Sequence, residues 1–291
     1  MLTRIDHVMI CPPRLDEGIE AYRRLGFDIY PGGVSSNRGT HNAIAFHGDD
    51  YLELASVSDR ATYLAANPKG GLVDFLDRGG GFRFVIVQSD DLASDVHAMR
   101  ERGVEVSDPT GGSRKTPDGR SLAWTLAVLG PREPLPLLFI QHLTPLVERR
   151  AQVPRAGQHP NGVLRTDRVY IAVPDLAAAL PPYSRVLGMP APPVQRGAVI
   201  KADMAVFDLG PTGLTVAQPA EPGPAAEALA RRGPGPFQVL YRTHSMDAAA
   251  RWMADHGVPP PARGVRNTGE QAMLVSPEHA CGAYIGFVGP A

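Results

Sequence analysis

The chain has 291 residues, of which 43% are hydrophobic and 20% are charged, a composition typical of a folded globular protein with room for two domains. Its 29 Lys and Arg residues almost balance its 30 Asp and Glu residues, so no net positive charge points to nucleic acid or to an anionic membrane as a partner. The two cysteines, Cys11 and Cys281, lack a CxxC spacing, which argues against a disulfide framework and against a structural zinc site.

The sequence contains no run of about eighteen apolar residues and no apolar N-terminal core of signal-peptide length. We therefore expect a cytoplasmic protein whose cysteines stay reduced. Its expected partner is a small molecule, with neither nucleic acid nor membrane as a partner, and the chain is expected to be a monomer or a homodimer.

Four stretches of the chain repeat one pattern, in which an apolar strand leads to an Asp or Ser placed as the N-cap of an amphipathic helix. The stretches begin about 70 to 85 residues apart, at Arg4, Phe82, Arg165 and Phe237. A glycine is expected to end each helix in the left-handed conformation. These glycines are Gly26, Gly103, Gly188 and Gly257.

Short β-like runs follow each helix. After the first helix they are FDIY (27–30), NAIAFHG (42–48) and DYLELAS (50–56), and His47 is expected to be exposed in the turn between the last two. Each copy therefore predicts a βαβββ module, and the fold class is α+β. The segment 61–80 between the first two copies predicts one or two additional helices.

Residues 146–163 are charged and rich in Pro and Gly, and they fall between the second and third copies. They predict a linker between an N-terminal domain (1–145) and a C-terminal domain (164–291), each with two modules. The order in which the modules pair remains open at this level.

The motifs DHVMI, LGF, GTHNAIAF, YLELAS, LPLLFIQH and HPNG, with a PDG turn before Trp124, occur in this order along the chain. In this pattern the chain resembles the vicinal oxygen chelate superfamily, which includes glyoxalase I, extradiol dioxygenases, methylmalonyl-CoA epimerase and bleomycin-binding proteins, and within it the glyoxalase-like branch. The resemblance implies that paired modules form two cupped mixed β-sheets. It also implies a divalent metal in a cup, held by the first and last strands of each module.

Carried over to this chain, the resemblance makes His7 and Glu53 the metal ligands of the first module. In the second module Phe84 occupies or adjoins the first-strand position. In the last strand Gln141 aligns better with the superfamily glutamate, whereas His142 is chemically the stronger ligand, so the third ligand is Gln141 or His142. Imidazole and carboxylate suit Fe, Mn, Ni, Co or Zn.

The C-terminal half departs further from the ligand pattern. Arg168 stands at the position of His7, a threonine near Thr215 at that of Glu53, and Gly286 at that of the last-strand ligand of the fourth module. No metal site is therefore expected in this half.

Other polar residues are candidates for binding substrate in the N-terminal cup. They are His41, Asn42, Arg83, Arg114 and Trp124. Each also has a purely structural interpretation: a turn explains the GTHN segment, and a solvated hairpin with a core tryptophan explains the segment around Trp124. His7 as a hydrogen-bonded structural histidine and Glu53 as an exposed strand carboxylate are likewise alternatives to the metal site.

The resemblance implies a metal-dependent lyase, isomerase or ring-cleaving dioxygenase that acts on a small substrate with vicinal oxygens, with Glu53 and His142 as catalytic groups. The alternative is a metal-free binding or resistance protein of the bleomycin-binding type. The substrate, the reaction and the metal are not identified at this level.

Overall fold

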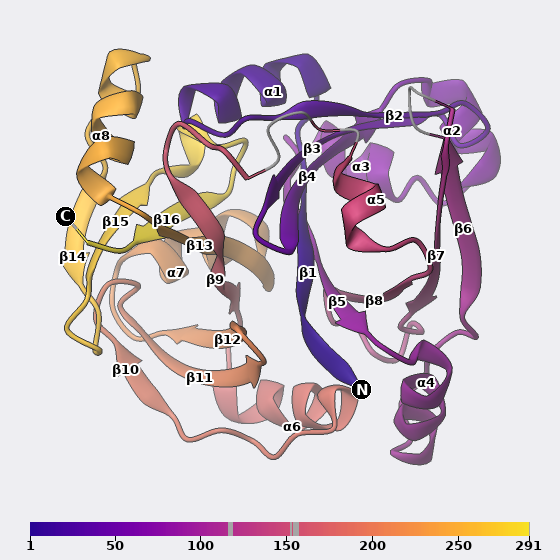
Figure 1. Cartoon of the computed structure of the whole chain (residues 1–291). Helices are drawn as coiled ribbons and strands as arrows, with labels where there is room; N and C mark the ends of the chain where they lie inside the picture. Colours follow the sequence, from indigo (N-terminus) through magenta and orange to yellow (C-terminus); the bar gives the residue numbers. More distant parts are fainter. Residues whose placement is uncertain (116–118, 152, 154–156, 291) are drawn as a thin grey trace.

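The computed structural model describes residues 1–115, 119–151, 153 and 157–290, so the PDG turn lies partly outside the described residues. The described residues form two eight-stranded mixed sheets with helices packed on them (Figure 1). The predicted α+β fold with four βαβββ modules is confirmed. The first sheet lies at the right of the view and the second at the left.

The first sheet has the order β2-β3-β4-β1-β5-β8-β7-β6. Modules one and two pair through β1 and β5, which run antiparallel at its centre, and this answers the question of pairing order. Its strands are β1 (Leu2–Cys11), β2 (Tyr30–Ser35), β3 (Thr40–His47), β4 (Asp50–Val57), β5 (Gly81–Ser89), β6 (Thr110–Lys115), β7 (Ser121–Val128) and β8 (Leu137–His142).

The second sheet repeats this arrangement in the order β10-β11-β12-β9-β13-β16-β15-β14, with β9 and β13 antiparallel at the centre. Its strands are β9 (Val163–Ala172), β10 (Gln195–Gly197), β11 (Ala202–Leu209), β12 (Thr212–Pro219), β13 (Gly235–Thr243), β14 (Ala262–Val265), β15 (Gln271–Val275) and β16 (Tyr284–Val288).

Four helices belong to the modules, and the others are additions to the sheets. The module helices are α1 (Leu15–Arg24), α4 (Leu92–Glu101), α6 (Leu176–Leu187) and α8 (Met246–Asp255). The additions are α2 (Arg60–Ala66), α3 (Leu72–Asp77), α5 (Leu146–Arg150), α7 (Pro224–Arg232) and the short 3-10 helix η1 (Pro277–His279). No helix within the described ranges is both long and apolar enough to cross a membrane.

Three of the four module helices begin as predicted, because the side chains of Asp91, Asp175 and Ser245 accept a hydrogen bond from the backbone three residues on. The exception is α1, where Arg14 is the N-cap and makes no such bond. The four glycines predicted to end the helices all have φ between 69° and 85°. Segment 61–80 forms parts of α2 and all of α3, as predicted.

A β-bulge interrupts the central strand of each sheet at an equivalent place. In β1 the partners of Ile5 and His7 on β5 are consecutive residues, so Asp6 is the extra residue. In β9 the extra residue is Asp167, between Thr166 and Arg168. A bulge re-aims the side chains next to it, which decides the geometry of the site described below.

The two sheets share one hydrophobic core, and polar residues are buried at the same junction. His47 is 0% exposed, so its predicted exposure in a turn is wrong. It packs against Tyr241 of the second sheet, with ring centres 4.9 Å apart. Because its partner comes from the other half of the chain, the local GDD turn signal could not reveal this burial.

Candidate functional site

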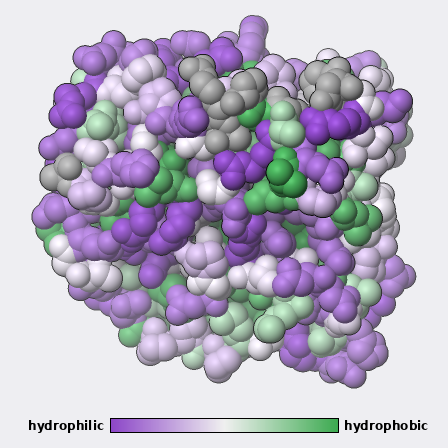
Figure 2. All heavy atoms as spheres, in the orientation of Figure 1, coloured by the Kyte–Doolittle hydropathy of each residue, from purple (hydrophilic) through white to green (hydrophobic). Residues whose placement is uncertain are grey.

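One face of the first sheet curves around α5 (Figure 1). We call it the concave face, and it includes Ile44 and Tyr51, which form a cluster against which Leu146 of α5 packs. Figure 2 shows a mostly hydrophilic surface on this side of the molecule, with a small hydrophobic group where α5 runs. α5 therefore covers part of the concave face, although it lies in the segment predicted as a linker.

His7 and Glu53 meet on this face. The His7 imidazole, in a residue only 5% exposed, lies between two carboxylates. Its Nδ1 donates to Asp6 Oδ2 at 2.7 Å, and its Nε2 is 3.4 Å from Glu53 Oε2. The ring also stacks on Tyr51, with centres 4.2 Å apart. Asn42 Nδ2 donates to Glu53 Oε1 at 2.6 Å, so both polar ends of the pair are held in place.

Asp6 extends this network to a second histidine. His142 Nε2 lies 2.9 Å and 3.1 Å from the two carboxylate oxygens of Asp6. Nη1 of Arg149, on α5, is 3.1 Å from the same nitrogen. The described residues offer no hydrogen-bond partner to His142 Nδ1, which is buried. A continuous polar network thus runs from Asn42 to Arg149 across the concave face.

The network keeps its carboxylates ionised. Burial raises the pKa of Asp6, but hydrogen bonds from His142 and His7 outweigh burial and hold it well below the usual value. Burial likewise raises the pKa of Glu53, and His7, Asn42 and the charge of Arg114 lower it by more. Burial lowers the pKa of His7, but the hydrogen bonds to Asp6 and Glu53 raise it above the ordinary value.

Gln141 does not join this group. Its side-chain amide accepts from the backbone N–H of Leu92 at 3.0 Å and donates to the carbonyl of Asp90 at 2.9 Å, so it binds the start of α4 on the opposite face. Of the two residues between which the sequence left the choice open, the structure brings only His142 to the network.

Strand register explains this outcome. Val8 and Val85 pair at the centre of the sheet and take equivalent places in the first strands of the two modules. The residues that precede them, His7 and Phe84, are therefore also equivalent. Glu53 is the parallel partner of Met9, and the corresponding partner in the second module is Leu138. Phe84 and Leu138 therefore stand where that module would carry ligands.

The predicted substrate-binding residues separate into several places. Asn42 contacts Glu53, and Trp124 lies beside His142 as its cross-strand partner. Arg114 donates to the carbonyl of Gly32, and its charge acts on Glu53. His41 lies on the face opposite to that of Asn42, and partial burial lowers its pKa more than the charge of Asp16 raises it. Arg83 lines a separate cavity, described below.

Sequence reasoning missed Asp6 and Arg149. Strict alternation along β1 would place Asp6 on the face opposite to His7, and only the bulge brings both to one side. One sequence feature could have indicated the bulge: an Asp stands at the same place in RIDHV and RTDRV, and these residues, Asp6 and Asp167, are the bulge residues of the two halves. In the second half Asp167 pairs with Arg242 at 3.0 Å.

His7 and Glu53 fit a divalent ion in two respects. Their facing atoms are 3.4 Å apart, which is close to the ~3.4 Å between neighbouring ligands of a tetrahedral ion bound at ~2.1 Å. A carboxylate on the other ring nitrogen, here Asp6, is the usual companion of a metal-binding histidine. However, no group of three or more His, Cys, Asp or Glu side chains within the described part of the chain could hold an ion. The residues fit an ion held by two protein ligands, not by four.

The second sheet lacks even this pair. Register places Arg168 at the position of His7 and Thr215 at that of Glu53, as predicted. Gly286 pairs with Leu240 at the corresponding place in the fourth module. The positions that correspond to His7, Glu53 and the last-strand ligand therefore carry Arg, Thr and Gly in this sheet.

The family model described as "Glyoxalase-like domain" matches residues 5–187. The chain belongs to this family. A second model, of the glyoxalase/bleomycin resistance protein/dioxygenase superfamily, matches residues 167–275 of this glyoxalase-like protein. The predicted membership of the vicinal oxygen chelate superfamily is thereby confirmed. A search among curated proteins finds no match.

Solved structures share the fold across the whole chain. A hypothetical protein from Staphylococcus aureus superposes with a TM-score of 0.70 at 14% identity, covering 99% of this chain and 100% of its own. A triple mutant of 4-hydroxymandelate synthase from Streptomyces coelicolor gives a TM-score of 0.66 at 15% identity, with 99% and 92% covered. Sequence identities of 14% and 15% show that the glyoxalase-like protein shares the fold of these two proteins, and nothing about its activity follows from them.

Proposed function

We propose that this protein is a metal-dependent enzyme that acts on a small organic substrate with vicinal oxygens, by a lyase, isomerase or ring-cleaving dioxygenase type of reaction. The observation that supports this most directly is the His7–Glu53 pair on the concave face, with the His7 ring fixed by Asp6. The superfamily to which the chain belongs includes metal-dependent enzymes of these types.

His7 and Glu53 would hold the ion. A divalent ion bound there would polarise a substrate carbonyl and offset the buried negative charge of the carboxylates. Fe, Mn, Ni, Co and Zn all accept this ligand pair. The remaining coordination positions would be left to water and substrate, which is the arrangement expected of a catalytic rather than a structural centre.

The surrounding side chains have separate roles in this proposal. Asn42 binds Oε1 of Glu53 and leaves Oε2 facing His7, so Oε2 is the atom that would hold the ion and that would take up a proton from the substrate when it leaves the ion. His142 is the second proton-transfer group, held by Asp6. Arg114 places a positive charge near Glu53 that would attract an anionic substrate, and Trp124 supplies a flat wall beside His142.

Elemental mass spectrometry of the purified full chain, after reconstitution with each of the five ions, tests this proposal. We expect about one ion per chain in the wild type and its loss in His7→Ala and in Glu53→Ala. Two matched variants should keep the ion: His97→Ala, because this histidine side chain is 76% exposed on α4, and Gln141→Leu, because Gln141 bonds to the backbone of Leu92 and Asp90 on the opposite face. Thermal melts verify that each variant is folded.

A wild type that stays metal-free after reconstitution would contradict the enzyme proposal. The alternative would then be a metal-free binding protein of the bleomycin-binding type. A specific observation favours it: Phe84 and Leu138 occupy the remaining ligand positions, and together with Tyr51 and Trp124 they make the concave face more aromatic and apolar than a four-ligand metal cup.

A further inference from the structure

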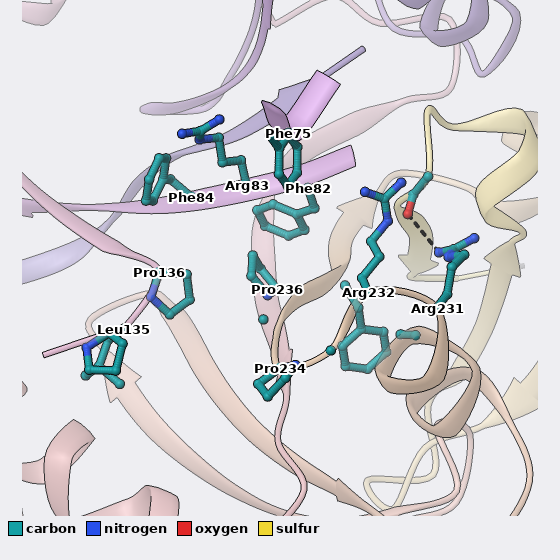
Figure 3. Close-up of a pocket in the computed structure, with 16 residues that line it drawn as sticks. Phe75, Phe82, Arg83, Phe84, Leu135, Pro136, Arg231, Arg232, Pro234 and Pro236 are labelled. Carbon is teal, nitrogen blue, oxygen red and sulfur yellow. Dashed lines mark hydrogen bonds between the residues drawn. The ribbon is translucent and has the colours of Figure 1, made fainter. Parts of the chain in front are cut away.

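A cavity of about 280 Å³ lies where the two halves of the chain meet. Its walls come from both halves (Figure 3): Phe75, Phe82, Arg83 and Phe84 belong to α3 and β5, whereas Arg231 and Arg232 end α7. None of Asp6, His7, Glu53 or His142 lines it. The cavity is therefore separate from the residues of the proposed metal site.

Two cations approach one aromatic ring in this cavity. The guanidinium carbon of Arg83 is 5.1 Å from the centre of the Phe75 ring and 5.2 Å from that of Phe84. The guanidinium carbon of Arg232, from the other half, is 5.8 Å from the same Phe75 ring. Stacking on rings orients a planar guanidinium and leaves its edge free to bind an anion.

These cations are not neutralised by carboxylates of the described residues. Among the described residues, Arg83 donates to the carbonyl of Gly71 and Arg231 to that of Gly282, and neither is paired with a carboxylate. The Nε of Arg232 is buried and has no hydrogen-bond partner among the described residues. An unsatisfied buried donor on a charged group is costly, so an anionic ligand would relieve a cost that the chain itself carries.

The backbone leaves room for Arg232 on two sides. A Cβ at Gly81 would lie 2.6 Å from its guanidinium carbon, and a Cβ at Gly282 would lie 2.6 Å from Nη2. Both glycines have positive φ, of 130° and 86°. Side chains at these two positions would displace the guanidinium, so glycine at both leaves space for Arg232 where it lies.

We propose that this cavity binds a small organic anion with a flat apolar body, of the aromatic carboxylate class. The carboxylate would pair with the forks of Arg232 and Arg83, which match its geometry. The ring would pack on Phe75, Phe82 and the prolines of the cavity wall. The volume suits a single-ring ligand, since pockets for drug-sized molecules start at about 300 Å³. This inference does not depend on the proposed function.

Isothermal titration calorimetry on the full chain tests it, with benzoate as probe and benzamide as its neutral counterpart. We expect saturable benzoate binding by the wild type, at least about tenfold weaker in Arg232→Gln and in Arg83→Gln, with Arg83→Lys between them. Arg263→Gln should bind like the wild type, because Arg263 is exposed and paired with Asp247 away from the cavity. Benzamide should bind at least about tenfold more weakly than benzoate.

The His7→Ala variant separates this site from the proposed metal site. Benzoate binding that is lost in His7→Ala but kept in Arg232→Gln would place the ligand on the concave face and overturn the inference. No saturable binding by the wild type, or equal affinity for benzamide, would also overturn it. Because Arg83 and Arg232 lie in different halves, either variant decides the question if the other fails to fold in a thermal melt.

Discussion

A single carboxylate, Asp6, organises the candidate site. It is fully buried, accepts from His7 and contacts His142 with both oxygens, so it fixes one ring on each side of the β1–β5 centre. The equivalent Asp167 shows that the bulge itself belongs to the fold. What is particular to the first half is the histidine that follows the bulge, in the place where the second half has Arg168.

The Asp6→Asn substitution tests how much of the local stability this charge provides. It preserves the shape but removes the charge that two imidazoles share, so we expect the free energy of unfolding to fall by about 2 kcal/mol. Urea denaturation measures it. The matched variant is Asp247→Asn, whose exposed pair with Arg263 should contribute less than about 1 kcal/mol. Equal losses in the two variants would mean that Asp6 is an ordinary structural carboxylate.

At the scale of single elements, the sequence predicts the helices, which depend on nearby residues, but it does not predict which residues of neighbouring strands face each other. Helix periodicity and the glycines after each helix depend on neighbours a few residues away, and all four module helices were predicted. The sequence of the FIQH segment aligned Gln141 with the superfamily glutamate, but the pairing of β8 with β5 shows that Leu138 is the residue equivalent to Glu53. Pairing partners that lie tens of residues apart cannot be read from one strand.

α5 is a second example of this limit. Residues 146–150 are charged and follow a proline, which is typical of a linker, and their composition gives no sign of the concave face that they cover. Leu146 packs with Tyr51, and Arg149 reaches His142. A short helix of this kind is defined by its contacts, and its own sequence carries too few residues for a periodic pattern.

The glycines that end the helices provide a prediction with an internal control. Gly26 and Gly103 both have positive φ, so alanine at either should cost about 1 kcal/mol through backbone strain. Only at Gly26 would the new Cβ also collide with a neighbour, 2.9 Å from the backbone nitrogen of Asn161. We expect Gly26→Ala to lower the free energy of unfolding by about 2 to 3 kcal/mol in total. Similar losses in both variants would show that the contact with Asn161 relaxes without cost.

At the scale of the whole molecule, the junction between the halves is polar as well as apolar. Asp50 Oδ2 accepts from the backbone N–H of Thr166, 116 residues away along the chain, at 2.8 Å. Oδ1 of Asp50, Nδ1 of His47 and the hydroxyl of Tyr241 are buried without hydrogen-bond partners among the described residues. Burial at this junction raises the pKa of Asp50 to about 7, although the Thr166 N–H partly offsets the effect.

This raised pKa predicts how stability depends on pH. Because Asp50 binds its proton more tightly in the folded chain than in the unfolded chain, its contribution is fully present below pH ~4 and is lost as pH rises through about 7. The other titratable groups facing it are His47, Arg4 and Tyr241, and burial lowers the pKa of His47 well below its ordinary value, which favours the neutral imidazole. Stability from this group should therefore fall by about 2 kcal/mol between pH ~5 and pH ~8.

The Asp50→Asn variant isolates this contribution, since asparagine still accepts from Thr166 but does not titrate. We expect its free energy of unfolding, measured by urea denaturation, to decline less than that of the wild type between pH ~5 and pH ~8, by about 2 kcal/mol. Asp203→Asn is the control, because Asp203 is an exposed carboxylate paired with Arg196 and its loss should leave the slope unchanged. Parallel curves for wild type and Asp50→Asn would mean that Asp50 is ionised at the junction, and that the two halves are joined there by a charge rather than by a protonated acid.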